Sequence, residues 1–226
     1  MTRPIAHRPR GDASGAQRTE THDVCLGAAL PRVSVAPPLA ALYAGRAMEP
    51  PVQATARLRL RAVVPGDLDV LYELWTDPNV RRWLWDDVAI TRDVARAAID
   101  ASVASFRTDG FGLFLVNHAA ADGVVGFCGL RRDGGDLELL YALAPAMWGF
   151  GYATEAAAAV LRDAFGRVRV PRVVARTDVP NAASIRVLER LGMRRVGHEP
   201  GPHGPLLAFE IAAGEFRGAR ARVTAG

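Results

Sequence analysis

A change of sequence pattern between residues 136 and 161 limits the fold more than any other feature of the chain. "DLELLYALA" is an apolar run of strand length, "PAMWGFG" is rich in turn formers, and "YATEAAAAVL" has the composition and spacing of a helix. A strand, a loop with two glycines and a helix are therefore expected in direct succession. The first N–H groups of a helix lack intrahelical partners, and glycine lets an anion approach them, so this segment predicts a site suited to a pyrophosphate.

The two glycines of this loop, Gly149 and Gly151, are weak evidence on their own because a tight turn also needs glycine. The commoner nucleotide motifs do not fit the loop. No lysine follows the glycines as in a P-loop, and neither a third glycine nor a ribose-binding acid is present as in a Rossmann unit. Other segments must therefore decide between a binding loop and a simple turn.

Strand and helix patterns alternate from Arg57 onward. "RLRLRAVV" alternates as a half-exposed strand does, a helix follows with Asp67 as its expected cap, and "DPNVRRWLW" is expected to be a turn leading into a short apolar anchor. Thr91 is expected to cap the next helix, after which residues 111–144 predict an antiparallel meander. A β-α-β-α-β segment completes the pattern. The prediction is an α/β fold of the α+β sandwich type, with a mixed central sheet and helices on both faces.

Residues 1–50 show no sustained period, so they are predicted to be a disordered extension or a non-native one upstream of a start at Met48. Residues 51–216 are predicted to form one domain and residues 217–226 a C-terminal tail. The net charge of +4 lies mostly in the first 47 residues, where six arginines oppose three acidic residues. The nearly neutral remainder does not favour a nucleic-acid partner.

The sequence gives no sign of export, a disulfide or a metal site. No apolar run is long enough to cross a bilayer and no signal core is present, so a cytoplasmic protein without membrane association is expected. Cys25 and Cys128 lie in very different contexts, which argues against a disulfide. His118, His198 and His203 lack the spacing of metal ligands, so no metal is expected.

Three segments in a fixed order make the glycine loop specific: "LRLRAVVPGDLDVLYELWTDPNVRRWL", "DLELLYALAPAMWGFGYATEA" and "ARTDVPNAASIRVLERLGMRRVG". With these segments, residues 57–213 resemble the GNAT superfamily of acyl-CoA-dependent N-acetyltransferases and, within it, the ribosomal-protein-alanine (Rim-type) branch. The resemblance implies that the strands "DLELLYALA" and "RVVARTD" splay apart. The slot between them would hold the pantetheine arm of acetyl-CoA.

The resemblance also implies which residues bind acetyl-CoA. The family motif Arg/Gln-x-x-Gly-x-Gly/Ala falls on residues 148–153, with a tryptophan at the polar first position, as in similar Rim-type sequences. Asn181 matches the asparagine that binds the pantetheine arm, and a plain N-cap role is an equally good interpretation. Glu155 is expected to complement the dipole of the helix that follows the loop. The implied binding residues are Leu143, Trp148, Gly149, Phe150, Gly151, Tyr152, Ala153, Thr154 and Asn181.

Two residues are implied to act in catalysis. Glu138 matches the acidic residue of the family strand pattern and is the candidate general base, with an ordinary strand carboxylate as the alternative. Ser184 lies where Rim-type enzymes place a hydroxyl proposed to protonate the departing thiolate, with local backbone bonding as the alternative. Leu188 occupies the register in which many GNAT enzymes carry a tyrosine.

The predicted function is transfer of an acetyl group from acetyl-CoA to a primary amine by direct attack. The amine acceptor is either a peptide N-terminus or a small molecule. Trp75, Trp83 and Trp85 lie in the region that forms one wall of the acceptor pocket in this family, although such residues are more often core. The alternatives are transfer of another acyl group, such as succinyl, and a non-catalytic CoA-binding regulatory module. A homodimer is compatible with each of these.

Overall fold

The computed structural model describes residues 51–121, 123–201 and 204–218. The predicted N-terminal extension, Cys25, His203 and residues 219–226 of the predicted tail lie outside these ranges. The helices and strands described below run from Gln53 to Ala212, inside the predicted domain.

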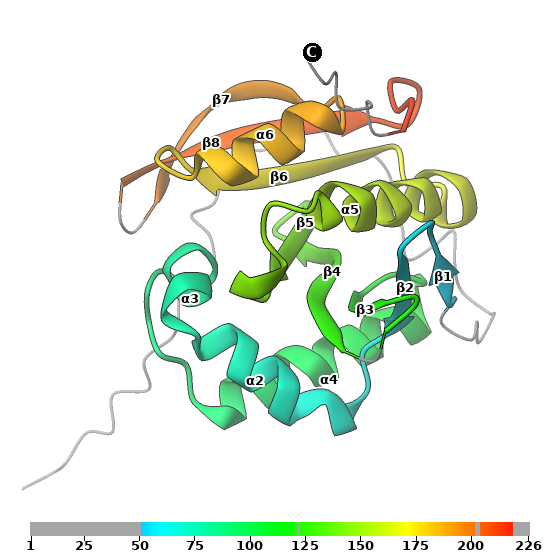
Figure 1. The fold of residues 1–226 in the computed structure, drawn as a ribbon. Coiled ribbons are helices and arrows are strands. Elements are labelled where there is room, and N and C mark those ends of the chain that lie inside the picture. The colour runs from blue at the N-terminus through cyan, green and yellow to red at the C-terminus, as the bar shows by residue number, and fades with distance from the viewer. Residues whose placement is uncertain (1–50, 122, 202–203, 219–226) are drawn as a thin grey trace, which may run out of the picture.

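An eight-stranded sheet forms the centre of the described part, in the order β1-β2-β3-β4-β5-β6-β8-β7 (Figure 1). Its strands are β1 (Gln53–Ala54), β2 (Leu58–Ala62), β3 (Leu113–His118), β4 (Val124–Asp133), β5 (Asp136–Leu143), β6 (Arg172–Asp178), β7 (Arg194–Gly201) and β8 (Gly204–Ala212). Neighbouring strands are antiparallel except β5 and β6, which are parallel. The predicted mixed sheet is therefore confirmed, and the expected meander consists of β3, β4 and β5.

Helices cover both faces of the sheet, as predicted, with α2 and α4 on one face and α5 and α6 on the other (Figure 1). They are α2 (Leu68–Thr76), α3 (Pro78–Leu84), α4 (Arg92–Asp109), α5 (Tyr152–Asp163) and α6 (Ala182–Arg190). Leu139 and Leu143 of β5 pack in the core shared with α5 and α6, whereas Leu140 and Ala142 pack toward α2 and α4. Because side chains alternate along a strand, β5 contributes to both cores.

The parallel strands β5 and β6 part from each other after a single pair in register, Glu138 with Val174. Beyond this pair, Tyr141 of β5 and Thr177 of β6 line one cavity. This arrangement agrees with the splay that the family resemblance implied. In the sequence, the end of β5 that parts from β6 directly precedes the glycine loop, which joins β5 to α5.

The expectation that "DPNVRRWLW" forms a turn is wrong, because residues Pro78–Leu84 form the short helix α3. Asp77 caps this helix by accepting a hydrogen bond from the Asn79 backbone N–H at 2.8 Å. Pro78 occupies its first turn, where a missing N–H has no cost. Val80, only 3% exposed, anchors α3 in the core beneath α2 and α4.

The two predicted helix caps differ in outcome. Thr91 caps α4 as expected, since its hydroxyl accepts from the Val94 backbone N–H. Asp67 does lie at the start of α2, but its side chain makes no capping bond there. It accepts instead from the Arg61 guanidinium and from the Val64 backbone N–H, so it holds the end of β2 rather than the helix.

Cys128 is fully buried in β4, and burial raises the pKa of its thiol, so it serves as a small apolar residue of the core. Within the described ranges, no helix combines the length and apolar character needed to span a membrane. Across the same residues, no three His, Cys, Asp or Glu side chains gather as metal ligands would.

Candidate active site

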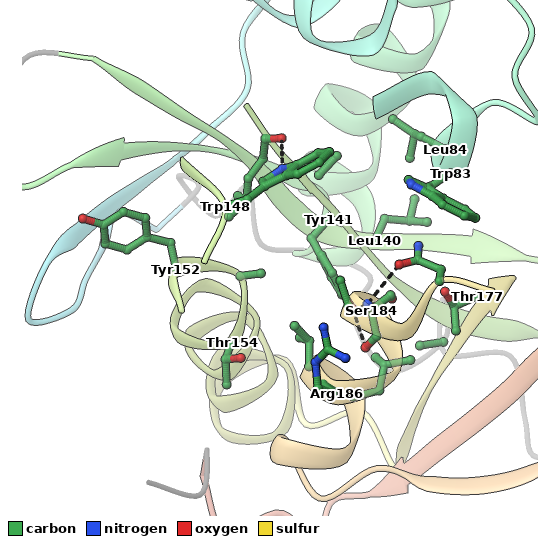
Figure 2. Close-up of a pocket in the computed structure, with 18 of the residues that line it drawn as sticks. Trp83, Leu84, Leu140, Tyr141, Trp148, Tyr152, Thr154, Thr177, Ser184 and Arg186 are labelled. Atoms are coloured by element: carbon green, nitrogen blue, oxygen red, sulfur yellow. Dashed lines mark hydrogen bonds between the residues drawn. The ribbon is translucent and has the colours of Figure 1, made fainter. Parts of the chain in front are cut away.

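A cavity of about 430 Å³ lies between α3, β5, β6, the glycine loop and α6 (Figure 2). It brings together most of the predicted binding residues and one of the two predicted catalytic residues. The predicted site residues among its lining are Leu143, Trp148, Gly149, Gly151, Tyr152, Ala153, Thr154, Asn181 and Ser184. Phe150 and Glu138 are not part of the lining.

The glycine loop presents an uncapped helix N-terminus to this cavity. Gly149 and Gly151 adopt φ values of 84° and 80°, in the left-handed region that glycine enters without strain. Gly151 is the N-cap of α5, and no side chain caps the first turn. Thr154, in that turn, is 8% exposed, and its hydroxyl has no hydrogen-bond partner in the described structure. The loop therefore offers backbone N–H groups and an unpaired buried hydroxyl to an anion.

The loop is tied to the edge of the sheet through Glu155. The Glu155 carboxylate accepts from the Thr55 hydroxyl at 2.6 Å, from the Arg57 backbone N–H at 3.0 Å and from the Arg57 Nε at 2.7 Å. Arg57 also donates to the carbonyl oxygen of Phe150 at 3.0 Å. Phe150 itself is 57% exposed and stacks on Tyr152, with 5.7 Å between the ring centroids. Glu155 thus supports the loop through these bonds, beyond the dipole role expected from the sequence.

Trp148, the departure from the family motif, bonds to the end of β5. Its indole Nε1 donates to the carbonyl oxygen of Leu143 at 2.8 Å (Figure 2). Leu143 is one of the residues that the family resemblance implies in acetyl-CoA binding. The tryptophan therefore holds the loop against the same strand end that the prediction assigns to the ligand.

Asn181 caps α6, which confirms one of its two interpretations. Its side-chain oxygen accepts from the Ser184 backbone N–H at 3.1 Å. The NH₂ group of the same side chain is a donor that this bond does not use. Because Asn181 also lines the cavity, the capping bond leaves its predicted role toward pantetheine open.

Ser184 forms a pair with Tyr141, a residue that the sequence did not assign to the site. The two hydroxyl oxygens lie 2.7 Å apart, between β5 and α6 (Figure 2). Burial raises the pKa of Tyr141, and its hydrogen bond with Ser184 offsets only part of this effect, so the phenol keeps its proton at neutral pH. The strand alternation was the available signal, because Tyr141 shares the face of Leu139 and Leu143, which points toward α6.

Glu138 is buried, with 3% of its surface exposed, and is held by two arginines. Its carboxylate accepts from Arg131 Nε at 2.9 Å and from Arg176 Nη1 at 3.4 Å. Arg176 lines the cavity, whereas Glu138 does not reach the cavity surface. The role of Glu138 as general base remains a prediction. Its alternative role, an ordinary strand carboxylate, requires partners such as these two arginines.

Two further arginines, Arg186 and Arg190, line the cavity from α6. No ion pair to an acidic residue is found for either of them in the part of the chain that the structure describes. They lie one helical turn apart, so their spacing in "SIRVLER" was a signal for a shared face. Arg186 lies on the same side of the Tyr141–Ser184 pair as Thr154 at the uncapped start of α5, so this end of the cavity is positive (Figure 2).

The fold and this site define a class of protein, an α/β enzyme whose parted parallel strands open onto an uncapped helix N-terminus. The acetyltransferase (GNAT) domain family matches residues 57–194, and the chain belongs to this family.

Relatives and solved structures agree with this assignment. An N-acetyltransferase named p20 from Bacillus licheniformis is 29% identical over 147 residues, covering 63% of this chain and 82% of the relative. A GNAT-family acetyltransferase from Bacillus anthracis has a similar structure, with a TM-score of 0.63, 24% identity and coverage of 73% of this chain and 99% of its own. A RimL ribosomal L7/L12 α-N-protein acetyltransferase in complex with coenzyme A gives a TM-score of 0.62 at 16% identity, covering 72% and 98%. The chain therefore has the fold of this family, Rim-type enzymes included.

Proposed function

We propose that this acetyltransferase moves an acetyl group from acetyl-CoA to the neutral primary amine of a peptide N-terminus or a small molecule. The observation that carries the proposal is the unpaired, buried Thr154 hydroxyl at the uncapped start of α5. A buried hydroxyl without a partner is unfavourable in the free protein, and a phosphate oxygen would satisfy it.

The residues of the cavity fit acetyl-CoA in three parts. The backbone of residues 149–154 would hold the pyrophosphate, with Arg186 and Arg190 as additional cationic partners. The Leu143 backbone and the Asn181 side chain would bind the pantetheine arm. The Tyr141–Ser184 pair lies between this end of the cavity and α3, where the thioester would then reside (Figure 2).

Acetyl-CoA supplies an activated thioester, and the chemistry left to the protein is modest. The amine nitrogen forms a bond to the acetyl carbon, the carbon–sulfur bond breaks, and the sulfur leaves as a thiolate that takes up a proton. In our proposal the Ser184 hydroxyl donates toward the sulfur, while the protonated Tyr141 hydroxyl donates to Ser184. A thiol with a pKa of about 8.5 needs little help from an acid, so this pair should contribute modestly.

The amine must lose its charge before it attacks and one proton afterwards. An α-amino group with a pKa of about 8 does so more readily than a lysine with a pKa of about 10.4. Glu138 is our proposed proton acceptor, acting through water because Arg176 separates it from the cavity. If the proton instead passes directly to bulk water, Glu138 has only a structural role.

A Thr154→Val variant tests the proposal because loss of the hydroxyl should affect acetyl-CoA binding and protein stability in opposite directions. If it binds a phosphate, the variant weakens acetyl-CoA binding about tenfold, measured by titration calorimetry. Its thermal stability should meanwhile stay equal or rise, since an unpaired buried hydroxyl is replaced by a methyl group. Ser105→Ala is the matched control, because the Ser105 hydroxyl is also buried and unpaired but lies on α4, outside the cavity. Unchanged acetyl-CoA affinity in Thr154→Val would contradict the site.

A thiol-release assay then separates the remaining alternatives. Turnover with acetyl-CoA and an amine panel supports the acetyltransferase, and faster turnover with succinyl-CoA would assign another acyl group. Tight binding of acetyl-CoA without turnover on any amine would instead indicate a regulatory CoA-binding module.

A further inference from the structure

The cavity has two chemically different ends. The anion end consists of the glycine loop, Thr154 in the first turn of α5, and Arg186 of α6 (Figure 2). The α3 end consists of Val80, Trp83, Leu84 and Leu140. Figure 2 shows Trp83, Leu84 and Leu140 gathered on one side of the Tyr141–Ser184 pair and Thr154 and Arg186 on the other. If the nucleotide part of acetyl-CoA occupies the anion end, the amine must approach from the α3 end.

The α3 end is an apolar wall on a firmly held helix. Val80 anchors α3 from below, and the Asp77 cap fixes its first turn. Trp83 is half-buried at the other end of the helix, with the Arg82 guanidinium 4.6 Å from its ring centroid. Leu140 reaches the same region from β5. A wall built in this way exists before any acceptor binds.

No carboxylate lines the cavity, all of whose lining residues are described. Its charged lining residues are Arg176, Arg186 and Arg190. Arg176 is shared among four carboxylates that lie outside the lining, so its charge is already balanced. An acceptor with several ammonium groups would therefore find no carboxylate counter-charge among the lining residues of the cavity.

We infer that the acceptor of this enzyme is a primary amine carried on a small apolar group, aromatic or aliphatic, that packs against Trp83, Leu84 and Leu140. The inference rests on the proposed acetyl transfer. The amine becomes an N-acetyl amide and the acetyl carrier leaves as the free thiol, so one acetyl group and one proton change places. A free arylalkylamine and a peptide with an apolar N-terminal residue present the same chemistry to this wall.

The test compares four acceptors in the thiol-release assay with saturating acetyl-CoA: phenethylamine, a C-terminally amidated peptide beginning with phenylalanine, the same peptide beginning with serine, and spermidine. We expect the first two to have kcat/KM values at least about tenfold above those of the last two. The ratio between phenethylamine and the phenylalanine peptide distinguishes a free amine from a peptide N-terminus. A preference for spermidine or for the serine peptide would overturn the inference while leaving acetyl transfer intact.

Two variants of Trp83 test the apolar wall directly. Trp83→Ala should raise the KM of the apolar amines about tenfold and leave the KM of acetyl-CoA unchanged. Trp83→Glu should lower the KM of spermidine, a gain that a misfolded protein cannot show. Val88→Ala is the control, because Val88 is 58% exposed and lies outside the cavity. Equal effects of Trp83→Ala on all acceptors would overturn the inference.

Binding measurements separate this inference from the proposed function. If no amine is turned over, phenethylamine is titrated into the protein saturated with coenzyme A. Binding that Trp83→Ala abolishes would sustain the apolar site and count against acetyl transfer. Absence of binding would overturn the inference.

Discussion

Replacing Gly151 by alanine should separate the binding role of the glycine loop from the backbone strain that any such replacement causes. Gly151 has a φ of 80° and lines the cavity, whereas Gly110, at the end of α4, has a φ of 78° and lies outside it. An alanine in the left-handed region costs about 1–2 kcal/mol, so Gly151→Ala and Gly110→Ala should be destabilised alike. For a chain of this size the expected decrease in Tm is about 2–8 °C in both variants.

Only the Gly151→Ala variant should lose affinity for acetyl-CoA. Its methyl group and the strained N-cap disturb the backbone that we assign to the pyrophosphate, so we expect Kd to rise at least tenfold, about 1.4 kcal/mol. Titration calorimetry gives Kd and differential scanning fluorimetry gives Tm. If both variants lose the same Tm and neither loses affinity, the loop is a turn and the assignment is wrong. If Gly110→Ala also loses affinity, strain alone explains the effect.

Three further predictions concern the Tyr141–Ser184 pair, Glu138 and Glu155. Ser184→Ala and Tyr141→Phe should each lower kcat by less than tenfold. Because the two hydroxyls form one unit, the double variant should have the same kcat as either single variant. Additive losses of kcat in steady-state kinetics would contradict a functional pair. Glu138→Gln should lower kcat and move the pH optimum upward with acetyl-CoA affinity unchanged; an unaltered pH–rate profile would count against the base. Burial raises the pKa of Glu155, but hydrogen bonds from Thr55 and Arg57 outweigh it, so the pKa lies below its ordinary value. Its contribution to stability is therefore present above the unfolded pKa of about 4.3 and is lost as pH falls below it. The Tm advantage of the native protein over Glu155→Gln should shrink in acid, and an advantage that persists in acid would contradict this.

The parts of the site that could be predicted from sequence are those whose signals are local. The glycine loop and the start of α5 follow from a change of period within a few residues, and Asn181 follows from a cap position beside a helix. The helix α3 was missed because its Asp-Pro-Asn start is also a turn signal. Proline is favoured both in turns and in the first turn of a helix, and the packing of Val80 decides between them here.

The parts that could not be predicted depend on partners far apart in the sequence. Tyr141 meets Ser184 across 43 residues, and Glu138 meets Arg176 across 38. Each residue alone fits several environments, because a strand tyrosine or glutamate can face core, solvent or ligand. Only the parting of β5 and β6 brings the first pair to the cavity, whereas Arg176 alone of the second pair reaches its surface.

The charges around the cavity bear directly on how the amine is deprotonated. An ammonium group at the α3 end of this cavity would meet apolar side chains and no carboxylate among the lining residues, and removal from water lowers the pKa of an ammonium. The cavity therefore favours the neutral, attacking form of the amine before any base acts. A carboxylate in direct contact would do the opposite, because it would stabilise the charged form. The burial of Glu138 behind Arg176 is thus compatible with catalysis in two ways, as a proton acceptor reached through water or as the support that fixes Arg176. The two roles predict different data for Glu138→Gln, since the first changes the pH–rate profile and the second lowers Tm alone.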